Sequence, residues 1–322
     1  MKTPSAIPFG AILLIAAAAC GSDHATDPDA SSLGDGATAP DAGDPGADAA
    51  PPAEVVLVGA GDIAGSGPGA EITAALIRGI PGTVFTLGDN AYSSGTAAEF
   101  MTRFDPTWGT FKDRILFPTA GNHDYVTADA SAYFAYFGAA AGDPTKGYYS
   151  ADLGAWHVVV LNSNCSEVGG CNAGSPQEQW LRADLAAHPN VCTVAMWHHP
   201  LWNIGQHGDA GQMYPMMQAL YAGGVDVVLA GHDHDYQRWT PMTPDGVPDP
   251  IRGVREFVVG TGGVGFYDFA RSDPHVEVQD NQTYGVLELT LRATDYDWQF
   301  VPEPGATFTD SGTGTCHGGT TP

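Results

Sequence analysis

Residues 84–92 read VFTLGDNAY, in which a short apolar run is followed at once by Gly88, Asp89 and Asn90, with Tyr92 close behind. Valine, phenylalanine and threonine favour extended backbone, and a run of this kind is typical of a strand buried on both faces. The glycine that follows favours a turn. This stretch therefore predicts a central strand that ends in a loop carrying polar side chains.

The same arrangement recurs along the chain, because five predicted strands end in segments that carry Asp, Asn or His. These strands and the segments that follow them are Val55–Val58 with Gly61–Asp62, Val84–Leu87 with Gly88–Tyr92, Ile115–Phe117 with Gly121–Asp124, Val191–Trp197 with His198–His199, and Val225–Ala230 with Gly231–His234. In open α/β sheets, binding sites collect beyond the carboxyl ends of the strands. We therefore expect the five loops to converge on one site.

Helical patterns between these strands indicate the α/β fold class. They cover Glu71–Gly79 and Gln177–Ala187, and the second has clear start signals. Ser175 can cap this helix, Pro176 suits its first turn, and Glu178 completes a capping box. Further strands are expected at Trp156–Leu161 and Phe257–Val259, with a final antiparallel pair at Tyr284–Leu291 and Tyr296–Val301.

The ligand types at the strand ends indicate what the site binds. Carboxylate, phenolate, amide and imidazole groups suit cations such as Fe, Mn and Zn, and no thiol stands among them. The set is too large for one ion with an open coordination position. It fits two ions that share a bridging carboxylate, and two ions roughly 3.5–4 Å apart are a standard device for phosphoryl transfer.

In this order, the five blocks resemble the motifs of the calcineurin-like metallophosphoesterases and, more closely, of the purple acid phosphatases. That family carries an Asp block, GDxxY, GNH followed by an acid, a His block and GHxH. Here the blocks are Asp62, GDNAY at 88–92, GNHD at 121–124, WHHP at 197–200 and GHDH at 231–234. The resemblance spans residues 54–316. It implies a single catalytic domain with a metallophosphoesterase-type αββα sandwich, in which two mixed sheets are flanked by helices.

The resemblance also implies a role for each ligand. The first ion, expected to be Fe(III), would be held by Asp62, Tyr92 and His234. The second ion, a divalent Fe, Zn or Mn, would be held by Asn122, His198 and His232, and Asp89 would bridge the two ions. One departure concerns the first block, which often reads Asp-x-Gly in the family but here continues as Ile63-Ala64.

The function implied is hydrolysis of small phosphate monoesters by attack of a metal-bound hydroxide, as in an acid phosphatase. The alternatives are a phosphodiesterase or nucleotide pyrophosphatase with the same metals, or a surface binding module. His123 and His207 are the candidate donors of a proton to the leaving group. Asp124 is expected to orient an imidazole, and Asn90 to bind phosphate or metal-bound solvent. His199 is expected either to contact the substrate or to orient a ligand.

The N-terminal residues indicate export. Residues 1–20 combine Lys2 with a short apolar run, which is typical of a secretory signal. Cleavage after Ala19 would leave Cys20 first, as in a bacterial lipoprotein; ordinary signal-peptidase cleavage is the alternative. Residues 21–53 are an acidic Ala/Asp/Gly/Pro segment, predicted to be a disordered linker, and residues 317–322 are a short tail. We expect a lipid-anchored protein of the cell envelope, or otherwise a secreted or periplasmic one.

The number of cysteines and the net charge indicate which disulfide bonds and which partners to expect. Without Cys20, four of the five cysteines remain, and exported chains tend to pair them. Pairing Cys165 with Cys171 and Cys192 with Cys316 is one of three combinations. The formal charge of -25 argues against a nucleic-acid partner. Contact with a membrane is expected only through the lipid on Cys20.

Overall fold

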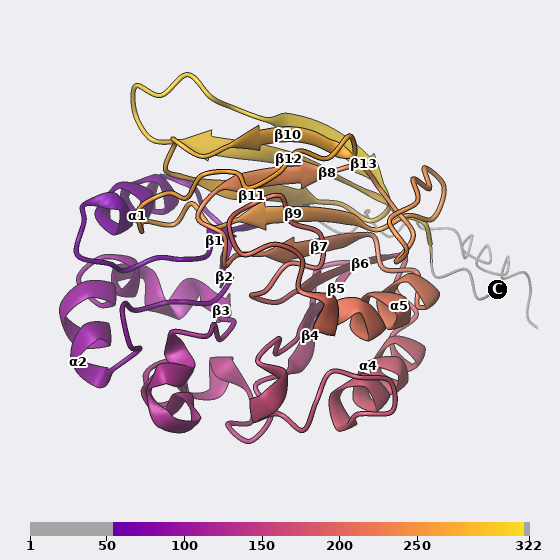
Figure 1. Ribbon diagram of the computed structural model, residues 1–322, viewed down its shortest axis with the longest axis horizontal. Coiled ribbons are helices and arrows are strands. Elements are labelled where there is room, and N and C mark those ends of the chain that lie inside the picture. The colour runs from indigo at the N-terminus through magenta and orange to yellow at the C-terminus, as the bar shows by residue number, and fades with distance from the viewer. Residues whose placement is uncertain (1–53, 319–322) are drawn as a thin grey trace, which may run out of the picture. The chain divides into compact units, whose positions relative to one another are not determined.

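The computed structural model describes residues 54–318. The expected signal peptide, the lipidated cysteine and the linker over residues 21–53 lie outside the described residues, as do residues 319–322 of the expected tail. The described part of the chain forms two mixed β-sheets packed face to face and flanked by helices (Figure 1). The fold class predicted from the sequence is therefore confirmed.

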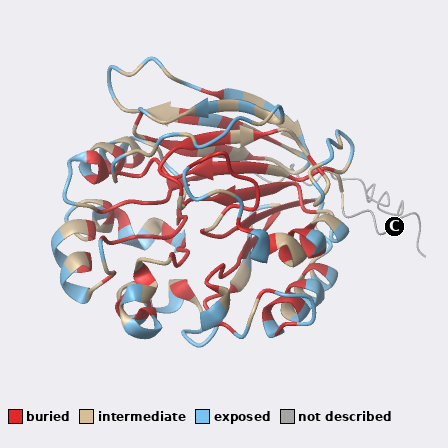
Figure 2. Cartoon of the chain, in the orientation of Figure 1, coloured by how far each residue is buried: buried red, intermediate tan, exposed pale blue. Residues whose placement is uncertain are grey.

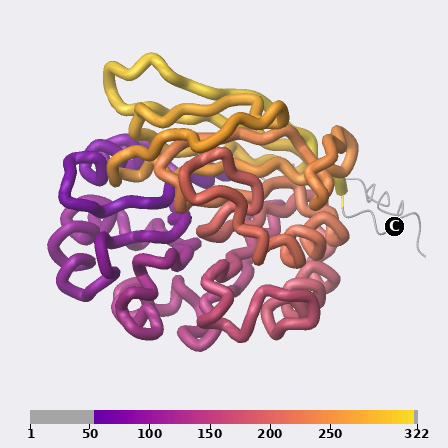
Figure 3. The backbone as a smooth tube through the Cα atoms, in the orientation of Figure 1, coloured from indigo at the N-terminus to yellow at the C-terminus, as the bar shows by residue number. Residues whose placement is uncertain are grey.

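The first sheet has six strands. Their spatial order is β13 (Ser311–Thr315), β12 (Asp295–Pro302), β11 (Gly285–Leu291), β1 (Val55–Ala60), β2 (Thr83–Thr86) and β3 (Ile115–Phe117). Strands β1, β2 and β3 are parallel, whereas β11, β12 and β13 pair antiparallel. Figure 3 shows that β1, at the start of the described chain, runs beside β11, which belongs to the last part of the described chain.

The second sheet has seven strands. Their spatial order is β10 (Val276–Asp280), β8 (Tyr236–Trp239), β9 (Arg255–Val259), β7 (Val227–Ala230), β6 (Cys192–Met196), β5 (Trp156–Val160) and β4 (Tyr149–Leu153). The four strands β9, β7, β6 and β5 are parallel, and β4 and β8 pair antiparallel with their neighbours. The parallel strands therefore end on the same edge of this sheet.

Alternate residues of these strands face two different cores, as the two-residue repeat of a strand requires. In β5, Val158 and Val160 join the core between the sheets, together with Leu287 and Phe300 of the first sheet. Val159 faces the other way, into a core beneath two helices. Because the central strands are covered on both sides, they are buried along most of their length (Figure 2).

The helices are short and lie outside the sheets. Their bounds are α1 Gly69–Gly79, α2 Ala97–Glu99, α3 Ser131–Phe137, α4 Pro176–Ala187 and α5 Tyr214–Ala222. Helix α1 packs on β11, and α4 packs on α5. Ser175 caps α4 as expected, since its Oγ accepts a hydrogen bond from Glu178 N at 3.3 Å. The Glu178 carboxylate accepts from Gly174 N rather than from Ser175 N, so the capping box is incomplete. Among the described residues, no helix has both the length and the apolar character needed to cross a membrane.

Two disulfide bonds join the four cysteines of the described chain. One is Cys165–Cys171, and the other is Cys192–Cys316. Cys192 begins β6 in the second sheet, and Cys316 follows β13 in the first. This second bond therefore fastens the two sheets to each other at one end of the sandwich.

Candidate metal centre

The loops beyond the strand ends have tight backbone geometry. Three of the predicted ligands have a positive φ that side chains rarely adopt: 61° at Asp62, 50° at Asp89 and 73° at His232. Glycine is required beside them. A Cβ on Gly88 would lie 2.5 Å from His198 Nδ1, and one on Gly121 would collide with Asp89 Oδ1. The glycines of the GDNAY and GNHD blocks therefore let two ligand loops touch.

Asp62, Tyr92 and His234 form one group of contacts around the phenol oxygen. Tyr92 Oη lies 2.8 Å from Asp62 Oδ1 and 3.1 Å from His234 Nε2. Asp62 Oδ2 also accepts a hydrogen bond from His232 N at 2.8 Å, which ties the first block to the last. These are the three residues expected to hold the first ion, and they lie within direct reach of one another.

Asn122, His198 and His232 form a second group. His198 Nε2 lies 3.0 Å from Asn122 Oδ1 and 3.2 Å from His232 Nδ1. His198 Nδ1 lies 2.7 Å from Leu87 O, so the backbone orients its ring. His234 is held in the same way, with Nδ1 2.7 Å from Gly265 O. In metal-binding histidines, one ring nitrogen typically forms a hydrogen bond to a backbone carbonyl, and the other ring nitrogen faces the metal site.

Asp89 lies between the two groups. Its Oδ2 is 3.0 Å from Tyr92 Oη on one side and 3.3 Å from His198 Nε2 on the other. Its Oδ1 accepts a hydrogen bond from His123 N at 2.7 Å. One carboxylate oxygen therefore faces both groups at once, which is the position that a bridging ligand must take.

The electrostatics of this cluster fit a bound cation. Asp62 and Asp89 are buried, and within residues 54–318 neither carboxylate forms an ion pair with Lys or Arg. Burial together with Asp62 and Asp89 raises the pKa of Tyr92 well above its usual value. Burial opposes a charge on His198, but Asp89 outweighs burial and raises the pKa of His198 to about 9. Asp62 and Asp89 thus favour the protonated forms of Tyr92 and His198. A bound metal ion would take the place of these protons on the phenol oxygen and the imidazole nitrogen.

His207, one of the two candidate proton donors, lies beside the second group of candidate ligands. Its Nδ1 lies 3.0 Å from Asp233 Oδ1, and its ring centroid lies 4.3 Å from that of His232. Asp233 is fully buried and also accepts a hydrogen bond from Asn203 Nδ2. This carboxylate sets the orientation of an imidazole that is still partly exposed at the edge of the site.

His123 also lies at the site, but backbone holds its ring. Its Nδ1 lies 2.6 Å from Ser93 O, and its ring centroid lies 4.5 Å from that of Tyr92. Its Nε2 lies 3.9 Å from Asp89 Oδ2. His123 therefore lies on the side of the first group, whereas His207 lies on the side of the second.

Asn90 and Asp124 support the GNHD loop. The Asn90 amide donates to Thr119 O at 2.9 Å and to Asp124 Oδ2 at 3.0 Å, and Asn90 is fully buried. Asp124 also accepts from Gly121 N at 2.9 Å. These contacts favour a positioning role for Asn90 over contact with phosphate. Asp124 fixes this loop through Asn90 and Gly121, and within residues 54–318 its carboxylate accepts no hydrogen bond from an imidazole.

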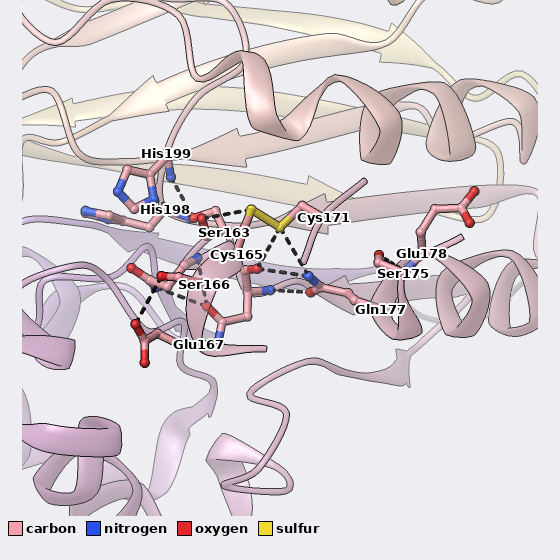
Figure 4. The surroundings of a disulfide bond; sticks show 12 residues. Ser163, Cys165, Ser166, Glu167, Cys171, Ser175, Gln177, Glu178, His198 and His199 are labelled. Atoms are coloured by element: carbon pink, nitrogen blue, oxygen red, sulfur yellow. Dashed lines mark hydrogen bonds between the residues drawn. A yellow bond between two sulfur atoms is a disulfide. The ribbon is translucent and has the colours of Figure 1, made fainter. Parts of the chain in front are cut away.

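His199 lies against a candidate ligand and lines a pocket. Its Nδ1 lies 2.8 Å from Ser163 Oγ, an interaction drawn in Figure 4, and its ring centroid lies 4.4 Å from that of His232. His199 also lines a pocket beside Asn122. It therefore buttresses a candidate ligand and faces the space that a substrate would enter.

Three further residues of the site were not predicted from the sequence. Asp233 orients His207, Ser163 holds His199, and the Tyr267 ring stacks on His234 with centroids 4.1 Å apart. Asp233 stands inside the GHDH block and could have been found there. Ser163 and Tyr267 belong to no block, so only the fold reveals them.

Comparisons with known proteins agree with this geometry. The sequence model of the calcineurin-like phosphoesterase family matches residues 50–236. The chain is 33% identical over 129 residues to purple acid phosphatase 18 of Arabidopsis thaliana, a match covering 38% of this chain and 28% of that protein. It is 27% identical over 186 residues to tartrate-resistant acid phosphatase type 5 of Rattus norvegicus, covering 48% of this chain and 55% of the relative. The matches thus cover about half or less of these relatives.

A solved structure supports the same fold. The purple acid phosphatase PPD1 of yellow lupin, Lupinus luteus, superposes with a TM-score of 0.70 at 18% identity, covering 81% of this chain and 54% of that one. At this level of identity the likeness shows the fold alone. The family match, however, covers more than half of the sequence and contains all five ligand blocks. The chain belongs to the calcineurin-like phosphoesterase family.

Proposed function

We propose that this protein is a phosphomonoesterase with two metal ions, similar in activity to the purple acid phosphatases. The observation that carries the proposal is the position of Asp89, whose Oδ2 lies 3.0 Å from Tyr92 Oη and 3.3 Å from His198 Nε2. Seven oxygen and nitrogen ligands from five loops thereby form one continuous cluster. A set of this size and composition suits two hard or borderline cations.

Each of the two groups of candidate ligands would hold one ion. Asp62, Tyr92 and His234 would hold the first ion, which we expect to be Fe(III) because a phenolate favours it. The second ion would be Fe, Zn or Mn, held by Asn122, His198 and His232, with Asp89 shared. When bound, such ions polarise the phosphoryl group and lower the pKa of the attacking water.

The protein itself would supply the proton for the leaving group. His207 lies beside His232, and Asp233 fixes its Nδ1, so its Nε2 is free to face a departing oxygen. A positioned donor of this kind typically contributes 10²- to 10⁴-fold to a rate. His123 is the second candidate, on the other side of the cluster. His199 would border the ester group, because it lines the adjacent pocket.

The experiment measures hydrolysis by the purified protein supplied with Fe, Zn or Mn. The substrates are p-nitrophenyl phosphate and bis(p-nitrophenyl) phosphate, and the variant is Asp89→Ala. Asp113→Asn is the matched control, because Asp113 is an exposed carboxylate that contacts none of the candidate ligands. We expect monoester turnover by the parent and the control, and none by Asp89→Ala. Faster turnover of the diester would favour a phosphodiesterase, and no turnover with any metal would favour a binding module.

We also propose that the protein is exported and anchored by a lipid on Cys20. The two disulfide bonds support an oxidising compartment, where such bonds form and persist. The test compares the full chain with a Cys20→Ala variant in a bacterial host. We expect the parent in the membrane fraction with the mass of a lipidated N-terminus, and the variant released into the soluble extract. Equal release of both proteins would contradict the anchor.

A further inference from the structure

A pocket of about 460 Å³ opens directly beside the candidate metal centre. Its lining includes Asn122 and His199 on the side of the metal ligands, and Tyr125, Val126, Glu167 and Gln212 farther out. Asn122 Oδ1 lies 3.0 Å from His198 Nε2, so the floor of the pocket is continuous with the second group of ligands. A phosphate ester bound at the metals would extend its alcohol into this space.

One wall of the pocket is a small ring closed by a disulfide bond. The bond joins Cys165 to Cys171, and Cys171 is buried (Figure 4). Behind the ring, the side chain of Gln177 accepts from Asn162 N at 2.7 Å and donates to Asn162 O at 2.9 Å. Gln177 Nε2 also lies 3.7 Å from Cys171 Sγ, so the ring lies against the first turn of helix α4, next to the segment that follows β5.

The same wall is also fastened to the metal-ligand loop. Asn164 Nδ2 donates to Ala120 O at 3.1 Å, next to the GNHD block. Glu167 N donates to Asn164 O at 2.9 Å, so the backbone that carries Glu167 is fixed relative to the candidate ligands. The Glu167 side chain itself is exposed, and its carboxylate accepts a hydrogen bond from the hydroxyl of Ser166 at 3.0 Å.

The charge of the pocket is one-sided. Glu167 is the one carboxylate in its lining, and within the described chain no lysine or arginine lines it. The lining also includes the phenol of Tyr125 and the exposed apolar side chain of Val126. An aromatic ring and a carboxylate both attract an ammonium group, and the carboxylate repels a second anion.

We propose that this pocket receives the alcohol part of the substrate and that Glu167 makes the enzyme prefer phosphate esters of amino alcohols. Esters with a neutral alcohol rank second, and esters that carry another negative charge rank last. The proposal rests on the phosphomonoesterase function proposed above and gives that function a substrate class. Glu167 is the residue that determines specificity, because it is the one carboxylate among the residues that line the pocket, and no lysine or arginine stands beside it there.

The test compares three esters of similar size that differ in the charge of the alcohol: phosphoethanolamine, propyl phosphate and phosphoglycolate. Values of kcat/KM are measured for the metal-loaded parent, Glu167→Gln and the control Asp113→Asn. A pair of unit charges about 6–7 Å apart in a medium like water changes an equilibrium about threefold. We expect the kcat/KM ratio of phosphoethanolamine to propyl phosphate to be about threefold higher in the parent than in Glu167→Gln, and the ratio of phosphoethanolamine to phosphoglycolate to be about tenfold higher. High salt should reduce both ratios.

Both ratios should therefore fall in Glu167→Gln, whereas Asp113→Asn, with the same change in net charge, should keep the ratios of the parent. Inhibition by inorganic phosphate, which has no alcohol group, should stay within about twofold in Glu167→Gln. Ratios that are equal in the parent and Glu167→Gln, with propyl phosphate still hydrolysed, would overturn the pocket proposal and leave the phosphatase intact. If the folded parent hydrolyses none of the three esters with any metal, the proposed function falls and the substrate class falls with it.

Discussion

Removal of the disulfide Cys192–Cys316 is expected to destabilise the protein far more than removal of Cys165–Cys171. The first bond closes a loop with a sequence separation of 124 residues and fastens the two sheets to each other. The second closes a separation of 6 residues within one loop. The perturbations are two double variants, Cys192→Ala with Cys316→Ala, and Cys165→Ala with Cys171→Ala.

The magnitude follows from the entropy of closing each loop in the unfolded chain. The chain-entropy relation gives about 5 kcal/mol for the long loop and about 2.4 kcal/mol for the short one, a difference of about 2.5 kcal/mol. Each bond has one fully buried partner, Cys192 in the first and Cys171 in the second. The small voids left by the missing sulfur atoms therefore nearly cancel when the two variants are compared.

The assay is urea unfolding of the oxidised parent and both double variants, followed by tryptophan fluorescence at one pH and one metal content. The expected result is a free energy of unfolding that is lower by about 2.5 kcal/mol in the long-loop variant than in the short-loop variant. Equal losses, or a greater loss for the short loop, would refute the argument. In addition, the short-loop variant should lose part of its preference for phosphoethanolamine, because the wall that carries Glu167 is no longer closed.

Two further predictions concern histidines. His207→Asn should lower kcat for propyl phosphate roughly 10²- to 10⁴-fold but have much less effect on p-nitrophenyl phosphate, whose leaving group departs without a proton. The same assay on His123→Asn serves for comparison. An equal loss of kcat on both esters in His207→Asn would exclude His207 as the donor. His157 lies between Asp152 Oδ1 at 2.8 Å and Asp184 Oδ2 at 2.9 Å, and although burial opposes its charge, these bonds raise its pKa. The protonated His157 therefore stabilises the fold fully below about pH 6.5, and this stabilisation is lost as pH rises through the pKa of His157 in the folded protein. The loss of unfolding free energy caused by His157→Gln, measured by urea unfolding, should be greater at pH 6 than at pH 9. A cost that grows with pH would contradict this.

The central parallel strands could be predicted from the sequence because both of their faces are buried. Strand β7 is a continuous apolar run and β6 is apolar apart from Thr193, and each is followed directly by its ligand block. The ligand positions could be predicted for the same reason, since a strand end and the residue after it are neighbours in any sheet. Pairing in three dimensions was not needed to find them.

The peripheral strands could not be predicted in this way. β10, VEVQD, and β13, SGTGT, lie at sheet edges with one side exposed, so they lack an apolar run. β13 forms because Gly312 lies against the Trp298 ring and Gly314 against the Tyr296 ring of β12, where any side chain would collide. Such a fit depends on a neighbouring strand and leaves no trace in local sequence.

The same limit applies to the periphery of the site. The partner of Asp233 is His207, which stands 26 residues earlier in a loop whose path is set by the fold. Tyr267 reaches His234 from the segment after β9. The positions of side chains that belong to long loops follow only from the three-dimensional structure, whereas those of side chains at strand ends can be predicted from the sequence.

The measurement that tests the account most directly is the metal content of the purified parent and of Asp89→Ala, taken together with their visible spectra and turnover of p-nitrophenyl phosphate. We expect about two metal ions per chain in the parent, a charge-transfer band if Fe(III) is bound by Tyr92, and loss of both metal and turnover in Asp89→Ala. Full turnover by a parent stripped of metal, or an Asp89→Ala variant that keeps two ions and full activity, would contradict it.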